Sequence, residues 1–211
     1  MNARLALAAA LALASSACAH RRELVDGGVI ITRTGCPQAG IPAGTGDVTL
    51  FDPAGSTDSS AIDVSATITN LRASCVASGN DWVSTVDFDV VANRRDRAAA
   101  RTVALPYFDV ILQGGESVAA KHVGQAVLEF PAGADRASVH LQTTGRVSRS
   151  AATLPADIQR RLAQPRKAGD ADAAVDPLAD PTTREAVARA TFEQLVGFQL
   201  TQDQLKYNAT R

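Results

Sequence analysis

The chain has 211 residues, the size of one domain with additional segments. Hydrophobic residues make up 45% and charged residues 20% of it, which is a globular composition and excludes wholesale disorder. The formal net charge of −1 argues against a dedicated nucleic-acid binder, because such proteins normally carry a basic excess. Three cysteines and three histidines leave little material for a metal cluster, so we expect no metal and no cofactor.

The first 19 residues have the pattern of a secretory signal peptide. Arg4 makes the start positive, residues 5–14 are all Leu or Ala, and small residues follow. This apolar run is too short for a membrane-spanning helix, which needs about 20 residues. The segment 17–19 also fits the Ala-x-Ala cleavage rule, which would release a soluble protein that begins at His20.

A second cleavage site competes with the first. Ser16-Ala17-Cys18 resembles the lipobox of bacterial lipoproteins, although the resemblance covers only the end of the signal peptide. It implies cleavage before Cys18 and a lipid on that cysteine. With Ala19 after the cysteine, it further implies an anchor in the outer membrane of a Gram-negative host. We favour the lipoprotein, because a cysteine at the end of a short Leu/Ala core is otherwise unusual.

Two cysteines remain once Cys18 is lipidated or removed. Cys36 and Cys75 would then lie in an oxidising compartment, where a pair of cysteines is expected to form a disulfide. Such a bridge stabilises the fold by about 3–4 kcal/mol in the chain-entropy model. The alternative is two independent buried thiols.

Residues 28–147 read as strands separated by turns. Alternation is clearest in two segments, where one face is apolar and the other polar. The apolar faces comprise Ile62, Val64, Ala66 and Ile68 in the first segment, and Trp82, Ser84, Val86, Phe88 and Val90 in the second. Seven or eight short strands with frequent turn signals predict a mainly β protein, an antiparallel immunoglobulin-like β-sandwich.

The weaker strands carry specific expectations. Short strands are predicted at residues 29–32 and 48–51. Pro106 interrupts an apolar strand, which should therefore be an edge strand or bulged, because proline donates no ladder hydrogen bond. Gly124 is expected to form a bulge, and a hairpin turning near Ala132 and Gly133 should follow it.

After residue 147 the period changes. Residues 148–180 should hold a short helix at 155–163 and a mobile linker at 164–179.

The final segment, 181–211, is expected to be helical. Asp180 is a good N-cap with Pro181 in the first turn, and Gly197 should end the helix. Thr201 and Gln204 form a capping box that should begin a second short helix. The first helix would carry an apolar face of Ala188, Phe192, Leu195 and Val196.

Two surfaces are candidates for binding a partner. The first is the helical tail, which either docks on the sandwich or presents Phe192, Leu195 and Phe198 to another protein. The second is the densest basic cluster, which would meet anionic lipid headgroups or an acidic partner unless it is a plain solvated turn. It comprises Arg94, Arg95, Arg97 and Arg101.

Catalytic templates find little support. Asp87 and Asp89 share a face and suit acid–base chemistry or Ca²⁺. The plainer interpretations are a solvated face, or pairing with an arginine on the next strand such as Arg101. His122 and His140 should lie off register on neighbouring strands, with residue 122 pairing near Thr143.

We therefore expect an exported envelope lipoprotein. It would be a non-enzymatic binding or scaffolding module that works in the periplasm through protein contacts, with the membrane bound through Cys18 and an envelope protein as partner. The alternative is a soluble periplasmic ligand-binding protein or hydrolase whose site is assembled from distant residues, with Asp87, Asp89, His122 and His140 as the candidates.

Overall fold

Strands dominate this protein in a computed structural model that describes residues 35–164, 169 and 175–210. The expected signal peptide, Cys18, the strand at 29–32 and most of the linker at 164–179 lie outside the described residues. The strands are β1 (Gln38–Gly40), β2 (Asp47–Phe51), β3 (Ile62–Ser78), β4 (Asp81–Arg94), β5 (Arg101–Gln113), β6 (Ser117–Phe130), β7 (Arg136–Ser148) and β8 (Phe192–Phe198). The helices are the short 3₁₀ turns η2 (Ser59–Ala61) and η3 (Pro177–Ala179), and the α-helices α2 (Ala156–Ala163), α3 (Pro181–Arg189) and α4 (Gln202–Thr210).

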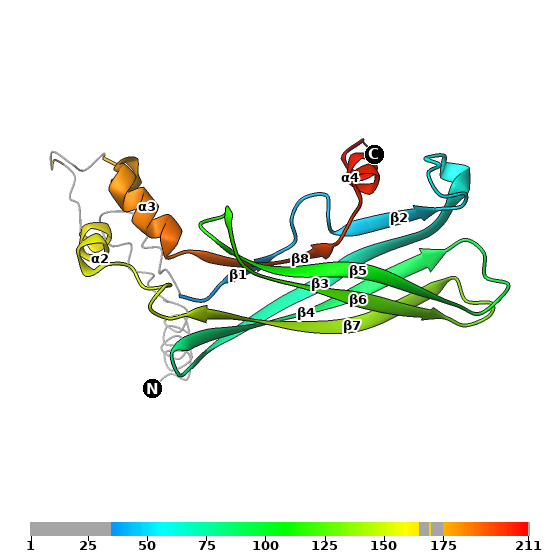
Figure 1. Cartoon of the computed structure of the whole chain (residues 1–211), viewed down its shortest axis with the longest axis horizontal. Coiled ribbons are helices and arrows are strands. Elements are labelled where there is room, and N and C mark those ends of the chain that lie inside the picture. Colours follow the sequence, from blue (N-terminus) through cyan, green and yellow to red (C-terminus); the bar gives the residue numbers. More distant parts are fainter. Residues whose placement is uncertain (1–34, 165–168, 170–174, 211) are drawn as a thin grey trace, which may run out of the picture. The chain divides into compact units, whose positions relative to one another are not determined.

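The strands form two four-stranded sheets (Figure 1). The first sheet has the order β1-β8-β5-β6, and the second has the order β2-β3-β4-β7. All pairings are antiparallel except the short parallel pair of β1 and β8. The mainly β, sandwich-like architecture expected from the strand pattern is therefore confirmed.

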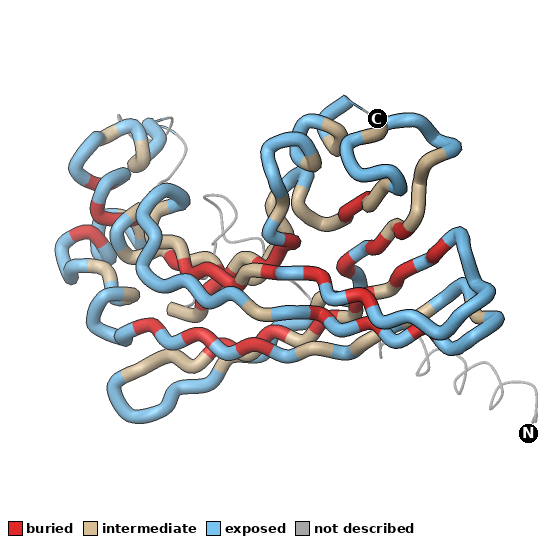
Figure 2. The backbone as a smooth tube through the Cα atoms, turned by 45° about the vertical axis from the view of Figure 1, so that its right-hand side comes forward, coloured by how far each residue is buried: buried red, intermediate tan, exposed pale blue. Residues whose placement is uncertain are grey.

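The core lies between the two sheets and follows the period-2 pattern. Val64 and Ala66 of β3 and Val86 and Phe88 of β4 are buried, as their alternation predicts. Their partners on the opposite sheet include Leu128 and other inward residues of β5 and β6. Figure 2 shows the resulting alternation of buried and exposed residues along the strands.

Two connections cross from one sheet to the other at the same end. Residues 95–100 join β4 to β5, and residues 131–135 join β6 to β7. The β5–β6 hairpin therefore belongs to the sheet opposite β4 and β7. The expected β6–β7 hairpin is wrong, because β6 and β7 belong to different sheets. Each strand buries an apolar row, and the two rows cover the core from opposite sides.

β5 is an interior strand, so the prediction of an edge strand at Pro106 is wrong. Its bulge lies between Ile111 and Leu112, away from the proline. The Pro106 carbonyl accepts a hydrogen bond from the Gln199 N–H (2.9 Å), so the backbone of Pro106 faces the β8 side. The last β8 residue paired with β5 is Phe198, opposite Tyr107, so the missing N–H of Pro106 falls just beyond the ladder.

β6 is continuous through Gly124, so the expected bulge is absent at this described position. Gly124 lies opposite Tyr107, and a Cβ added at Gly124 would come within 2.6 Å of the tyrosine ring. The glycine is needed for this close approach of a buried aromatic ring.

The helix predicted from Pro181 begins as expected but ends early. The Asp180 carboxylate accepts the Thr183 N–H (3.2 Å), which confirms the cap. The predicted helix through Val196 is wrong, because β8 begins at Phe192 and pairs with β5. Phe192, Gln194, Val196 and Phe198 alternate inward, and pairing with β5 buries this row where a helix would not.

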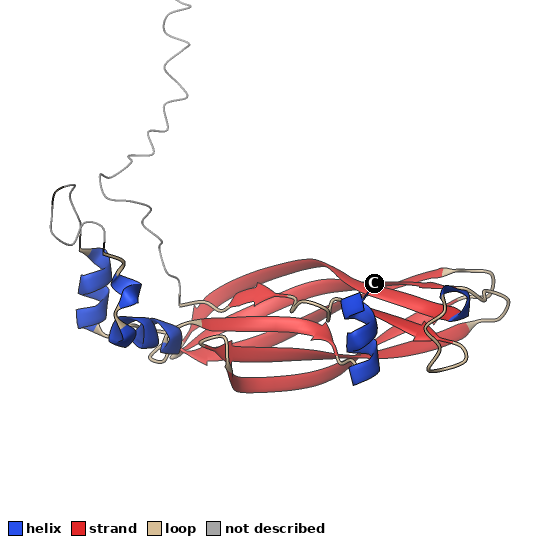
Figure 3. Ribbon diagram, turned by 90° about the horizontal axis from the view of Figure 1, so that it is seen from above, coloured by secondary structure: helices blue, strands red, loops and turns tan. Residues whose placement is uncertain are grey.

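The other helices match local signals. The predicted short helix at residues 155–163 is α2, whose Ile158 packs with Ala186 and Val187 of α3. Figure 3 shows α2 and α3 side by side, with α4 lying against the strands elsewhere. In α4 the capping box is confirmed: the Gln204 N–H donates to Thr201 Oγ1 (3.3 Å), and the Thr201 N–H donates to Gln204 Oε1 (2.9 Å).

α4 docks on β2. The Asn208 side-chain amide donates to the carbonyls of Gly44 and Asp47, both at 2.8 Å. The ring of Tyr207 meets Phe51 edge to face, with 5.1 Å between ring centroids. Among the described helices, none combines the length and hydropathy needed to cross a membrane.

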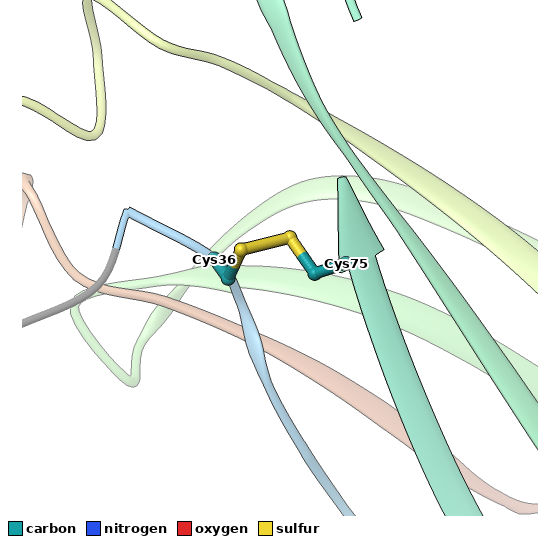
Figure 4. The surroundings of a disulfide bond; sticks show 2 residues. All are labelled: Cys36 and Cys75. Carbon is teal, nitrogen blue, oxygen red and sulfur yellow. A yellow bond between two sulfur atoms is a disulfide. The ribbon is translucent and has the colours of Figure 1, made fainter. Parts of the chain in front are cut away.

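The predicted disulfide between Cys36 and Cys75 is present (Figure 4). It joins the segment just before β1, in one sheet, to β3, in the other, across 39 residues of sequence. The neighbouring Gly35 lies against the Trp82 indole, where a Cβ would come within 2.3 Å of Nε1.

Candidate functional site

Arg94, the first member of the basic cluster, is a structural residue. Only 6% of it is exposed. Its guanidinium donates to the carbonyls of Ala99 (2.7 Å), Pro131 (2.8 Å) and Ala134 (2.8 Å). Arg94 thus ties together the two connections that cross between the sheets, and its assignment to partner binding is wrong, because its charge is not presented to solvent.

Two of the other arginines in the cluster pair with acidic side chains. Arg101 donates two hydrogen bonds to Asp63, each of 2.7 Å, which lower the pKa of that carboxyl below its ordinary value. The expected pairing of Arg101 with Asp87 or Asp89 is therefore wrong. Arg97 lies 3.7 Å from a carboxylate oxygen of Asp135.

The apolar residues expected to bind a partner belong largely to the core. Phe192 and Phe198 are buried between the sheets. Leu195 is half-buried on the outer face of β8, and its side chain lies beside Gly40 of β1. Their assignment to a partner-binding helix is wrong, because this segment is a strand inside the first sheet.

Three of the four residues proposed for a ligand or hydrolytic site do come together. His140 of β7 lies directly opposite Asp89 of β4, with 2.8 Å between His140 Nδ1 and Asp89 Oδ1. Its Nε2 lies 3.6 Å from Asp87 Oδ1. The carboxylates raise the pKa of His140, chiefly through the Asp89 hydrogen bond, and the same bond lowers the pKa of Asp89.

This Asp87–His140–Asp89 cluster lies on the solvent-facing side of the second sheet. Asn70 and Gln142 also donate to its carboxylates, at 2.8 and 2.7 Å. His122 is absent from the cluster, because it pairs with Asp109 on the first sheet, so the predicted register near Thr143 is wrong. Within the described ranges, no group of three or more His, Cys, Asp or Glu is arranged to hold a metal ion.

Sequence reasoning missed a buried polar group between the sheets. Asp109, on the inward row of β5, accepts hydrogen bonds from the Thr143 hydroxyl and from the Gln194 amide (3.1 Å to Oδ1). A carboxylate on the same parity as Leu105 and Tyr107 was the signal available in the sequence. The Asp109 carboxylate thus links β5 and β8 of the first sheet to β7 of the second.

Sequence reasoning also missed the outer row of β6. We use this name for the solvent-facing residues Lys121, Val123, Gln125, Val127 and Glu129, all of which are exposed. Val123 is 52% and Val127 is 44% exposed, and Ala104 and Pro106 extend the exposed surface onto β5. The signal available in the sequence was the period-2 spacing of these five residues between two turns.

β6 is also the last strand of its sheet, with β5 on one side and no other described strand hydrogen-bonded along its free edge. A strand edge presents N–H and C=O groups that can pair with another chain. The Lys121 ammonium lies 5.7 Å from the centroid of the Phe108 ring, which holds this end of the outer row against β5.

The fold and these surfaces define a two-sheet, disulfide-linked β protein with an exposed, partly apolar strand edge. Comparison with family models, with curated proteins and with solved structures finds no match.

Proposed function

We propose that this protein is an exported envelope lipoprotein, anchored to the outer membrane through lipidated Cys18. It acts there as a non-enzymatic binding or scaffolding module through protein contacts. The signal-peptide pattern of residues 1–19 and the Cys36–Cys75 disulfide support export, because disulfides persist in oxidising compartments. We also propose that the sandwich is immunoglobulin-like, which is supported by two packed sheets whose strands are mainly antiparallel.

One observation carries the contact function. The outer row of β6 exposes Val123 and Val127 beside the free edge of the same strand. Backbone groups on such an edge supply affinity, and neighbouring side chains supply specificity, when an extended segment is added to a sheet. The working surface of this proposal is therefore β6 rather than the arginines or the tail.

The anchor is tested by the mass of the N-terminal peptide from membrane and soluble fractions. We expect a diacylated or triacylated Cys18 in the membrane fraction. A free His20 in the soluble fraction would contradict the anchor.

The contact surface is tested by placing a photo-crosslinking amino acid at Val123 or Val127 in the full exported chain. Thr144, an exposed outer-face residue of β7, is the matched control position. We expect adducts with protein chains at positions 123 and 127 and few at 144. Equal labelling at all three positions, or none at 123 and 127, would contradict a role for the β6 surface.

A further inference from the structure

We propose that the partner of β6 is a second copy of this chain. Two β6 strands pair antiparallel about a two-fold axis at Gln125 and join the two first sheets into one eight-stranded sheet. This inference rests on the proposed contact function and names its partner. It is carried by three observations: the edges that the fold leaves available, the direction of the β6 backbone, and the order of side chains along the outer row.

The two sheets have four edge strands, β1, β2, β6 and β7. β1 has only three residues, and β2 has five and carries α4, whose Asn208 amide binds the Asp47 carbonyl. β6 and β7 are long, with 14 and 13 residues. Long edges without proline, as β6 and β7 are, need either a partner or some feature that prevents pairing.

β7 has such a feature. It contains no Asp or Glu, and its solvent-facing row includes Arg136, His140 and Arg146. Antiparallel pairing of two β7 strands about residue 141 would place Arg136 opposite Arg146 at both ends, and like charges directly opposite each other are destabilising. No register of this pairing supplies an acid from either strand. β6 carries both charges, Lys121 and Glu129, in the same row.

The β6 backbone points the required groups outward. The Pro106 carbonyl faces β8, and Pro106 lies opposite Gln125. In an antiparallel pair, two residues opposite each other either both bond to the partner strand or both point away from it. Because the Pro106 backbone points away from β6, the N–H and C=O of Gln125 point away from β5, toward the free edge. The same holds at every second residue of this bulge-free stretch, and so for the whole outer row.

The side chains of the outer row are complementary about Gln125. A two-fold axis there places Lys121 opposite Glu129 of the second copy and Val123 opposite Val127, each pair occurring twice. Gln125 lies opposite Gln125 of the second copy. Moving the axis to residue 124 would oppose Lys121 to Val127, and moving it to residue 126 would oppose Val123 to Glu129, so the Gln125 register alone pairs opposite charges and valines together.

The test is the molar mass of the purified full chain by sedimentation equilibrium in density-matched detergent. We expect a reversible dimer. Lys121→Glu places two acids opposite each other at both ends of the interface and should raise the dimer dissociation constant about 10-fold or more. Lys121→Glu combined with Glu129→Lys restores opposite charges and should return the constant to within about 3-fold of the wild-type value.

Arg146→Glu on β7 is the matched charge reversal outside the interface, and it should leave the dimer unchanged. Circular dichroism of each variant confirms folding. Gln125→Cys supplies a second readout in cells, because two cysteines at the axis can form a disulfide, and we expect a covalent dimer there and none with Arg146→Cys.

A monomeric wild-type chain, or charge reversals without loss and rescue, would overturn the dimer. If the β6 positions still crosslink to a different protein, the dimer fails and the proposed contact function stands. If they crosslink to nothing, both fail.

Discussion

The guanidinium of Arg94 lies over the ring of Phe130, 5.1 Å from its centroid, at the end of the sandwich where both inter-sheet connections cross. Phe130 is the last residue of β6 and Arg94 is the last of β4, so this contact joins strands of opposite sheets. The same guanidinium binds carbonyls in both connections. The chain thus uses one buried cation to close the end of its core.

Arg94→Ala should lower the free energy of unfolding by about 2–4 kcal/mol, because it leaves several carbonyls near the core without their charged donor. Urea unfolding measures this loss. Arg95→Ala, at an exposed neighbour, is the control and should change stability by less than about 0.5 kcal/mol. Equal effects of the two substitutions would contradict the structural role of Arg94.

Removing the disulfide by Cys36→Ala combined with Cys75→Ala should destabilise the fold by about 3–4 kcal/mol, since the bridge closes a long loop in the unfolded chain. Denaturant unfolding measures the loss, and a reducing agent should have a similar effect on the wild-type protein. A double variant as stable as the wild type, or a reductant that destabilises the double variant equally, would argue against this contribution.

The Arg101–Asp63 pair makes stability depend on pH. The pKa of Asp63 is lower in the folded chain than in the unfolded one, so the stabilisation is complete above the unfolded pKa of about 3.9 and is lost as pH falls through the folded pKa. Asp63→Asn should therefore cost about 0.5–1 kcal/mol at pH 7, a figure kept small because water reaches the Arg101 side chain. Unfolding at neutral pH and in strong acid should show this cost shrinking in acid.

Asp135→Asn is the matched control, because the pair of Asp135 with Arg97 is longer and both side chains are exposed. It should have little effect under either condition. A cost of Asp63→Asn that is the same at neutral pH and in strong acid would contradict the ion pair.

The raised pKa of His140 is open to direct measurement. An NMR titration of the imidazole should show a midpoint above its ordinary value, because Asp89 stabilises the charged ring. The associated stabilisation is present below the unfolded pKa and is lost as pH rises through the folded pKa. Asp89→Asn should move the midpoint down more than Asp87→Asn does, since the Asp89 hydrogen bond is the larger cause.

Features that depend on neighbouring residues follow from the amino-acid sequence alone. The capping box of Thr201 and Gln204, the N-cap at Asp180, and the inward rows of β3 and β4 are all set by spacing along the chain. The disulfide followed from counting cysteines in an expected oxidising compartment. In each case the partner is close in sequence or is the only remaining candidate.

The misassigned segments share a different property. Residues 188–196 carry an apolar pattern that fits a helix. Pairing with β5 makes the end of this segment a strand instead, and β5 lies far away in sequence: Asp109, which binds Gln194, is 85 residues earlier. Arg94 resembles its exposed neighbours in sequence, and its acceptors Pro131 and Ala134 lie 37 and 40 residues away.

Local spacing therefore specified where most strands and helix caps lie, because those preferences are set within a few residues. The assignment of β6 and β7 to opposite sheets, the burial of Arg94, and the free edge that exposes the outer row of β6 came from assembly. These features depend on which apolar faces pack together in one core and on which backbone groups find hydrogen-bond partners far along the chain. Both are decided by contacts between distant segments, which local spacing does not specify.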